Sequence, residues 1–223
     1  MQHTEVFTRP AAYISRLSGI VTLPSGHDPA KEKLPVILFL HGAGEVGDGS
    51  PESVKRVCVH GVPKYFGADA DFGGLRVITV SPQCPAGLIW DQVTLQLMEY
   101  LDAAVKTFGG DPDRVAVTGL SMGGFGTWNL ISTYPERFWR AAPICGGGVP
   151  WRVNERVKDM PIRVFHSVDD DSVPYICSVL MVKRAQAAGA KVEFTTWCGE
   201  GHGCWERAYE QTDLLCWLAG AAD

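Results

Sequence analysis

Short apolar runs alternate with longer amphipathic stretches along most of this 223-residue chain. Apolar runs bounded by turn residues predict buried strands, and stretches with apolar residues every three or four positions predict helices. The expected strands are Val36–Leu40, Val77–Ser81, Val115–Gly119, Ala141–Ile144, Ile162–Phe165 and Val192–Thr196. The expected helices are Gln92–Thr107, Met122–Tyr134, Val173–Ala188 and Trp205–Leu218. The alternation predicts an α/β fold with a doubly wound, mostly parallel sheet and helices on both faces.

The ends of the chain are expected to belong to the same unit. Residues 1–35 suggest an antiparallel hairpin at one edge of the sheet, with Pro24–Asp28 as its loop. Hydrophobic residues make up 46% of the chain and charged residues 20%, which is typical of a globular protein of this length. We therefore expect a single domain over residues 1–223, without an insertion large enough to form a lid.

Charge and cysteine usage bear on partners and location. The formal net charge is −5 and no block of five basic residues occurs, so neither nucleic acid nor a membrane surface is an expected partner. Met1–Pro24 lacks the apolar core of a signal peptide, and no run reaches the roughly 18 apolar residues of a membrane span. Seven irregularly spaced cysteines favour reduced thiols. These features predict a cytoplasmic protein and leave its oligomeric state open.

The strongest local signal is the sequence Gly-Leu-Ser-Met-Gly at 119–123, which follows an expected strand and precedes an expected helix. Gly119 and Gly123, two residues to either side of Ser121, allow a tight strand-to-helix turn that holds the serine in a strained, exposed conformation. The Met122 amide would then point at the oxygen of an attacked carbonyl. A glycine-rich helix start used for packing or phosphate binding is the alternative. The context favours a nucleophilic serine.

A serine nucleophile needs a histidine base and an acid that orients it. His166 and His202 follow Ser121 in the sequence. His202 lies in a glycine-rich loop after the last expected strand and is the better base, whereas His166 ends a strand and is expected to make a structural hydrogen bond. The acid should follow the strand Ile162–Phe165, where residues 169–171 are all aspartate. The residues alone leave the choice among these three open.

Three segments in this order resemble the alpha/beta-hydrolase superfamily, and more narrowly its cap-less bacterial esterases, a group labelled predicted peptidases or phospholipase/carboxylesterase-like proteins. The segments are Leu40–Glu45, Asp111–Val115 and Gly119–Gly124, and the resemblance extends from about Leu34 to Trp217. It implies the alpha/beta-hydrolase fold and ester hydrolysis without a metal or organic cofactor.

The resemblance also assigns roles to individual residues. The family places its acid four residues beyond a histidine-glycine pair and before a valine-proline pair, which implies Asp170, although Ser167 replaces the glycine. The family's glycine-histidine-x-x-aromatic pattern fits Gly201 to Trp205 and implies His202. The segment 41–44 implies that the amide of Ala43 joins that of Met122 in an oxyanion hole.

The substrate pocket is the least determined part of the site. Gly44, Gln83, Trp90 and Trp205 are candidates for substrate binding, because they lie in or beside segments that follow strand ends. Packing at the rim of the core explains each tryptophan equally well. Cys198, His202 and Cys204 could suggest zinc, but the chain has no C-x-x-C pair to complete four ligands, so no metal is expected.

Together these features predict a serine carboxylesterase that acts on small, short-acyl esters through an acyl-enzyme, with Ser121, His202 and Asp170 as its triad. A peptidase, amidase or thioesterase could use the same residues. A non-catalytic binding module on this fold is the remaining alternative.

Overall fold

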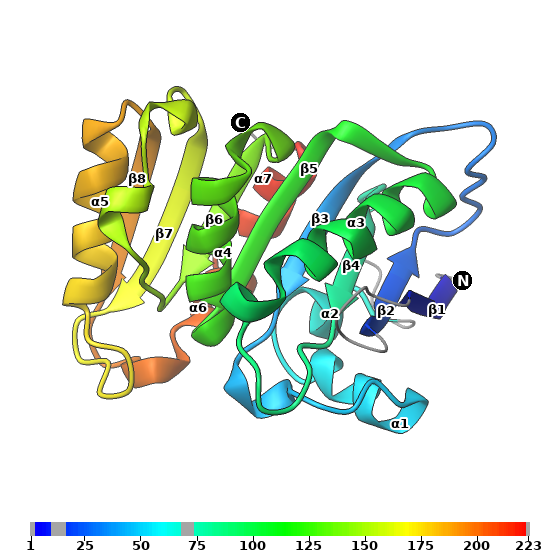
Figure 1. Cartoon of the computed structure of the whole chain (residues 1–223), viewed down its shortest axis with the longest axis horizontal. Coiled ribbons are helices and arrows are strands. Elements are labelled where there is room, and N and C mark those ends of the chain that lie inside the picture. The colour runs from blue at the N-terminus through cyan, green and yellow to red at the C-terminus, as the bar shows by residue number, and fades with distance from the viewer. Residues whose placement is uncertain (1–2, 10–16, 68–73, 222–223) are drawn as a thin grey trace.

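One sheet organises the protein, and the computed structural model describes residues 3–9, 17–67 and 74–221 of it. The sheet has eight strands in the order β1-β2-β4-β3-β5-β6-β7-β8 (Figure 1). Their bounds are β1 His3–Arg9, β2 Leu17–Leu23, β3 Leu34–Leu40, β4 Ile78–Pro82, β5 Gly110–Leu120, β6 Arg140–Ile144, β7 Pro161–Ser167 and β8 Lys191–Trp197. All neighbours from β4 to β8 are parallel, so the predicted strands and the mostly parallel sheet are confirmed.

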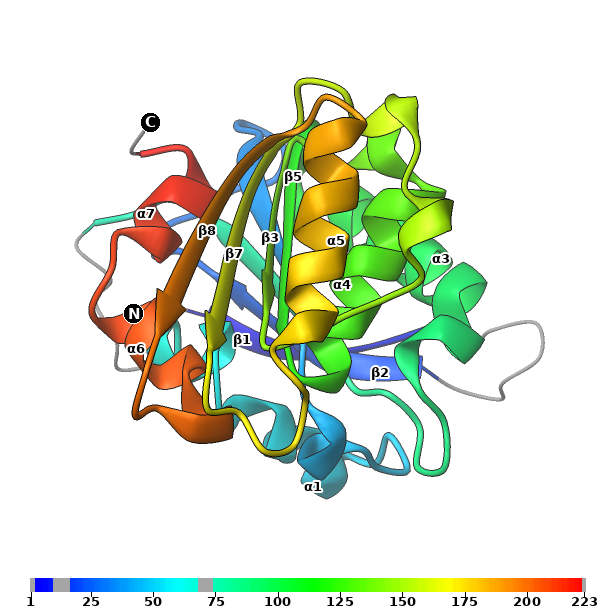
Figure 2. The same ribbon diagram turned by 90° about the vertical axis from the view of Figure 1, so that its left-hand side faces the viewer.

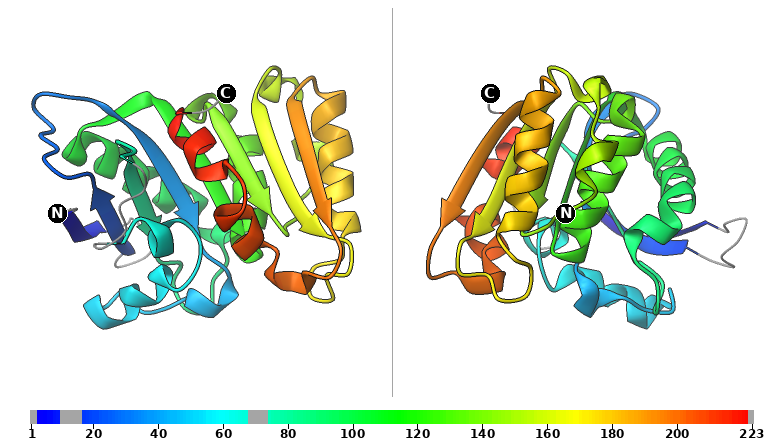
Figure 3. Two further views of the ribbon diagram at one scale, coloured as in Figure 1. Left: turned by 180° about the vertical axis from the view of Figure 1, so that it is seen from behind. Right: turned by 60° about the vertical axis from the view of Figure 1, so that its left-hand side comes forward.

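Helices cover both faces of this sheet, as the alternating pattern predicts. Figure 2 shows α3, α4 and α5 on one side and α6 and α7 on the other, and Figure 3 shows the second side from behind. The bounds are α1 Pro51–Val54, α2 Val62–Tyr65, α3 Thr94–Phe108, α4 Met122–Thr133, α5 Ile176–Ala187, α6 Trp205–Glu210 and α7 Leu214–Ala219. Among the described residues, no helix is long and apolar enough to cross a membrane.

The central strand β3 shows why its sequence is apolar at every position. Val36 and Leu38 belong to the core beneath α3 and α4, whereas Ile37 and Phe39 belong to the core beneath α6 and α7. Successive side chains of a strand point to opposite faces, so a strand covered on both sides must be apolar throughout. All four of these side chains are fully buried.

The structure corrects the predicted loop of the N-terminal hairpin. The predicted hairpin exists as the antiparallel pair β1 and β2, but Pro24–Asp28 follows β2 and leads into β3 instead of closing the hairpin. Residues 10–16, which join the two strands, lie outside the described residues. The loop prediction failed because a proline-glycine turn marks a change of direction without saying which strands pair across it.

The predicted helix Trp205–Leu218 is in fact two helices, α6 and α7. Thr212 lies in the break, where its hydroxyl donates to the carbonyl of Ala208 (2.6 Å) and accepts from the amide of Leu214 (3.1 Å). A threonine side chain that takes over main-chain hydrogen bonds in this way competes with a continuous helix.

The parallel strands place their carboxyl ends along one edge of the sheet. In Figure 2 the arrowheads of β7 and β8 point to this edge, where α1 and α6 lie. In open α/β sheets the loops at this edge form the binding crevice. The loops after β3, β5, β7 and β8, which carry the candidate residues of the sequence, all emerge there.

Candidate active site

Ser121 is the single residue between the end of β5 and the start of α4. Its backbone has φ 54° and ψ −119°. Few non-glycine residues of the described chain have a positive φ, and Ser121 is one of them. A residue with a side chain adopts this conformation only when its surroundings enforce it. The strained strand-to-helix turn that the sequence predicts is therefore confirmed.

The flanking glycines are required by the close approach of main chains at this turn. A Cβ atom on Gly119 would overlap the carbonyl of Gly123, and a Cβ atom on Gly123 would overlap the carbonyl oxygen of Leu40 at the end of β3. Any larger residue at either position would push α4 away from the sheet. Glycine here fixes the position of the helix and, with it, the position of Ser121.

The structure brings His202 into contact with Ser121. His202 lies in a short 3-10 helix, Gly201–Gly203, after β8, and its Nε2 is 2.9 Å from Ser121 Oγ. Its Nδ1 is 2.8 Å from Asp170 Oδ2, so the ring proton belongs on Nδ1 and Nε2 accepts the serine proton. The indole of Trp205 packs against the imidazole edge to face, with 5.2 Å between ring centroids.

Asp170, one of three consecutive aspartates, is the one that contacts this histidine. Its side chain is fully buried, and its Oδ1 accepts hydrogen bonds from the amides of Ser172 (2.9 Å) and Val173 (2.8 Å). Burial by itself would raise the pKa of Asp170, but the hydrogen bonds from His202 and these amides outweigh it and hold the pKa below its usual value. Asp170 is thus a buried, ionised carboxylate facing His202.

The neighbouring aspartates lie elsewhere. Asp169 is exposed and accepts hydrogen bonds from the Ser167 hydroxyl and, at 2.9 Å, from the Gly199 amide, so it ties the loop after β7 to the loop after β8. Asp171 is exposed and accepts from the hydroxyl of Ser172 at 3.1 Å. The structure therefore separates three residues that the sequence pattern could not.

Sequence reasoning overlooked one member of this group. His166 is fully buried, and its Nε2 lies 3.1 Å from Asp170 Oδ2, the oxygen that also faces His202. The expectation of a structural hydrogen bond at His166 is correct, but its partner was not foreseen. The signal was the four-residue spacing between His166 and Asp170, which allows a tight loop to bring the two side chains together.

The loop after β3 lies beside the serine. A Cβ atom on Gly42 would be 3.8 Å from Ser121 Cβ, which places this loop directly against Ser121. Ala43 begins a 3-10 helix, Ala43–Glu45, and Met122 begins α4. The first amides of a helix have no partner within the helix.

His41 braces this loop from within the core. Its Nδ1–H donates to the carbonyl of Gly42 (2.6 Å), its Nε2 accepts from the amide of Cys84 (2.9 Å), and its own carbonyl accepts from Trp90 Nε1 (3.0 Å). Burial lowers the pKa of His41 to about 4, against which the bond to Gly42 acts only weakly. A neutral imidazole therefore links the end of β3 to the loop after β4.

A cavity of about 280 Å³ opens beside Ser121. Its walls are mostly apolar, and they are formed by Ile89, Trp90, Asp91, Ser121, Met122, Phe125 and Val173. Trp90, a predicted substrate contact, lines this cavity although its side chain is almost fully buried. Trp205 contacts His202 instead.

The other predicted substrate contacts lie in the loops around the site. Gly44 is exposed, and a Cβ atom there would meet nothing within 4 Å. Gln83 is buried and donates to the carbonyls of Glu45 (2.9 Å) and Ser53 (2.8 Å), so its amide group holds the loop after β3 in place. Trp151, another tryptophan near the edge of the sheet, is 81% exposed.

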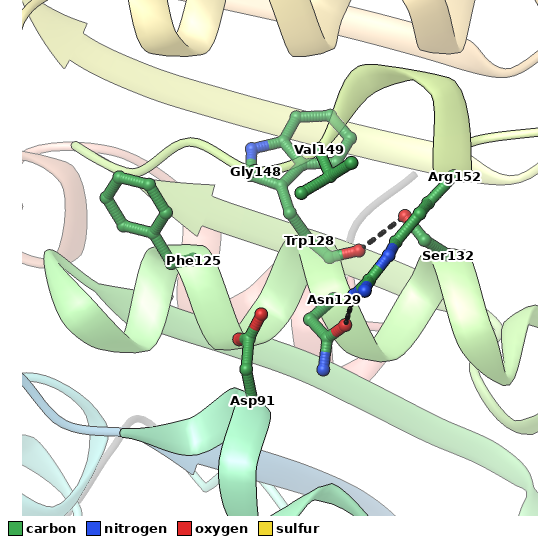
Figure 4. Close-up of a pocket in the computed structure, with 8 residues that line it drawn as sticks. All are labelled: Asp91, Phe125, Trp128, Asn129, Ser132, Gly148, Val149 and Arg152. Carbon is green, nitrogen blue, oxygen red and sulfur yellow. Dashed lines mark hydrogen bonds between the residues drawn. The ribbon is translucent and has the colours of Figure 1, made fainter. Parts of the chain in front are cut away.

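A second, much smaller pocket adjoins the cavity along α4 and shares Asp91 and Phe125 with it. Figure 4 shows Phe125, Trp128, Asn129 and Ser132 from α4 facing Asp91 and the segment 148–152. Arg152 donates to the Asn129 side chain at 3.3 Å. Burial raises the pKa of Asp91, and the charge of Arg152 partly offsets this rise. This second pocket therefore carries a carboxyl group and a guanidinium group among its lining.

Potential metal ligands gather in a different set from the one that the sequence suggested. Ligand atoms of Cys145, Asp170 and His202 lie within 4.8 Å of one another. Asp170 and His202 are hydrogen-bonded to each other. Burial raises the pKa of the Cys145 thiol well above its ordinary value, and this disfavours the thiolate that a metal needs. These donors fit a metal poorly. The seven cysteines, all within the described residues, are free thiols.

Comparisons with known proteins identify one matching family model and several relatives. A family model described as "Putative esterase" matches residues 13–172. A protein named "Uncharacterized secreted protein" from Arthroderma benhamiae is 26% identical over 82% of this chain and 22% of its own length. "Probable carboxylesterase SOBER1-like" from Arabidopsis thaliana is 24% identical over 74% of this chain and 71% of its own. The chain thus spans about a fifth of the first of these relatives.

Solved structures give the same result. The crystal structure of a thermostable esterase superposes with a TM-score of 0.81 and 31% identity, covering 96% of this chain and 62% of that one. A feruloyl esterase module from Clostridium thermocellum, solved as its S954A mutant with sinapinate, superposes with a TM-score of 0.73 at 16% identity, and covers 93% and 83% of the two chains. The second likeness shows the fold alone.

We predict that Gly123→Ala destabilises the protein by more than about 3 kcal/mol, because its Cβ would overlap the Leu40 carbonyl and force α4 from the sheet. Urea unfolding followed by circular dichroism measures this change. Gly44→Ala is the matched control, since its Cβ meets nothing within 4 Å, and it should change stability by less than about 0.5 kcal/mol. Equal effects of the two substitutions would contradict the packing argument.

We predict that the free energy of unfolding decreases in acid because His41 takes up a proton more readily in the unfolded state. The unfolded state binds a proton at His41 near pH 6.5 and the folded state only near pH 4, so its contribution is complete above pH 6.5 and is lost as the pH falls towards 4. Between pH 7.5 and 4.5 this loss should be about 2 to 3 kcal/mol. Urea unfolding of the wild type and of His41→Asn at both pH values isolates the part of this loss that is due to His41. If the variant loses as much stability between the two pH values as the wild type, the prediction is wrong.

Proposed function

The chain belongs to the esterase family whose model it matches, and from that premise we propose that it is a serine carboxylesterase in which Ser121 is the nucleophile, His202 the base and Asp170 the acid that orients the base. The single observation that carries the proposal is the continuous hydrogen-bonded series from Ser121 Oγ through His202 to Asp170 Oδ2. The mostly parallel sheet and its likeness to the thermostable esterase show the alpha/beta-hydrolase fold.

In the proposed reaction, Ser121 Oγ attacks the ester carbonyl while His202 Nε2 takes the hydroxyl proton. The carbonyl oxygen becomes an anion, and the amides of Ala43 and Met122 stabilise it. Asp170 stays ionised and stabilises the imidazolium through Nδ1. The C–O bond of the ester then breaks, and the alcohol leaves with the proton from Nε2.

The resulting acyl-enzyme is hydrolysed by the same groups. His202 takes a proton from water, the hydroxide oxygen attacks the acyl carbon, and the acid leaves as Ser121 regains its proton. Each donor of the oxyanion hole contributes roughly 3 kcal/mol to stabilising these intermediates. The proposed chemistry uses only side chains and main-chain amides and calls for no metal or organic cofactor.

The cavity beside Ser121 supports small substrates. A volume of about 280 Å³ bounded by Ile89, Met122, Phe125 and Val173 accommodates a short acyl or alcohol group among apolar walls. Trp90 forms part of the wall, and its indole N–H donates to the His41 carbonyl. We therefore propose short-acyl esters as the substrate class, and a small-molecule ester as the partner.

The cytoplasmic location expected from the sequence remains a prediction. The free thiols of Cys84, Cys145 and Cys204, all buried, are compatible with a reducing compartment. One relative is named as a secreted protein. Fractionation of the source cells with an antibody to this chain would decide between the two compartments.

We predict that the protein hydrolyses p-nitrophenyl acetate and butyrate faster than the laurate, because the cavity is short, and that Ser121→Ala lowers kcat by about four orders of magnitude or more. Release of nitrophenol measures both. Ser25→Ala, which alters an exposed serine in the turn after β2, is the matched control and should retain full activity. A folded protein without activity on any ester would shift the assignment to amide or thioester substrates, or to binding.

We also predict that Asp170→Asn lowers kcat by about three to four orders of magnitude, since an amide can neither fix the tautomer of His202 nor stabilise its charged form. Asp169→Asn is the matched comparison. It removes a loop contact to the Gly199 amide and should reduce kcat less than about tenfold. Steady-state kinetics on p-nitrophenyl acetate checks this, and a larger loss in the Asp169 variant would overturn the assignment of the acid.

A further inference from the structure

A second histidine is built into the base of the proposed triad. His166 lies near the end of β7, and its side chain has no exposed surface. Its Nε2 faces two oxygens, Asp170 Oδ2 at 3.1 Å and the carbonyl of Val173 at 3.0 Å. Its Nδ1 is 2.7 Å from the hydroxyl of Ser178 on α5, which is itself 2.9 Å from the carbonyl of Gly146. Every polar atom of the buried ring therefore has a partner.

The partners determine where the ring carries its proton. A carboxylate and a carbonyl can only accept hydrogen bonds, so the proton of the neutral His166 ring belongs on Nε2, and Nδ1 accepts the hydroxyl proton of Ser178. Burial lowers the pKa of His166, against the weaker opposing effects of Val173 and Asp170, so the ring stays neutral at neutral pH. His166 is thus a neutral donor that points its N–H at the carboxylate of Asp170.

This contact completes the hydrogen bonding of the Asp170 carboxylate. Oδ1 accepts from two main-chain amides, and Oδ2 accepts from His166 on one side and His202 on the other. Four donors therefore hold the carboxylate through both of its oxygens. Without the bond from His166, Oδ2 would be held by His202 alone, and only the two amides on Oδ1 would fix the carboxylate independently of the base.

We propose that His166 is a positioning residue: it fixes Asp170 Oδ2 in the plane that aligns His202 with Ser121. This inference rests on the proposed function, because it assigns His166 a part in the same triad. His166 does not line the cavity beside Ser121. Its effect must therefore appear in kcat rather than in KM.

The side-chain geometry of histidine provides a matched pair of variants. The amide nitrogen of His166→Gln can occupy the place of Nε2 and still donate to Asp170, whereas that of His166→Asn matches Nδ1 and reaches only towards Ser178. Both variants keep a polar amide in the buried site. His166→Leu removes both contacts at similar volume and serves as a third variant.

For p-nitrophenyl acetate, we expect His166→Asn and His166→Leu to lower kcat by about 10- to 100-fold with KM changed less than twofold, the size of effect seen when outer partners of an active group are lost. His166→Gln should restore kcat to within about threefold of the wild type. If a folded Asn or Leu variant keeps kcat within twofold, or if Gln is as slow as Asn, the inference is wrong.

A readout that needs no turnover separates this inference from the proposed function. Proton NMR of each folded variant follows the Nδ1–H of His202, whose far-downfield signal reports its bond to Asp170. We expect the signal in the wild type and in His166→Gln, and expect it shifted or broadened in His166→Asn. A wild type that hydrolyses no ester but shows this pattern would overturn the proposed function and keep the positioning role. An unchanged signal in His166→Asn would overturn the positioning role.

Discussion

The arrangement of the site depends on the contact between the start of α4 and the end of β3. Gly123 packs so closely against the carbonyl of Leu40 that no side chain fits between them. This contact sets the distance from α4 to the sheet and forces the residue before the helix into a left-handed conformation. It also brings the loop after β3 against Ser121. Ser121, the proposed nucleophile, and the loop that carries Ala43 are therefore positioned by one packing constraint.

Electrostatic preorganisation follows from how polar groups are buried around this contact. Asp170 is the buried ionised group of the site, and its charge is shared among four hydrogen-bond donors. His41 and His166 are buried as neutral rings whose pKa values are lowered by burial, so they add directional hydrogen bonds without adding charge. The proton that the proposed reaction moves is thus confined to Ser121 and His202, where solvent and substrate have access.

The cavity beside Ser121 takes its walls partly from segments outside the proposed triad. Residues 89–91 follow β4 and Phe125 lies on α4, whereas Met122 directly follows Ser121 and Val173 lies in the loop after β7 that carries Asp170. Ile89 is half exposed, whereas Trp90 is almost fully buried in the core. Substitutions at Ile89 can therefore change the cavity without disturbing the main-chain contact that places the serine.

Much of this could be predicted from the sequence alone. Strands buried on both faces leave continuous apolar runs, so β3 to β8 were found close to their observed bounds, except that β5 begins at Gly110 and not at Val115. The glycines around Ser121 predicted the strained turn. The choice of Asp170 among three adjacent aspartates depended on the fold of a loop, which the residues alone left open and only a resemblance suggested. Tertiary structure decided three further features: the contact of His166 with Asp170, the break at Thr212 and the pairing of β1 with β2. Each results from contacts whose geometry the local sequence does not fix.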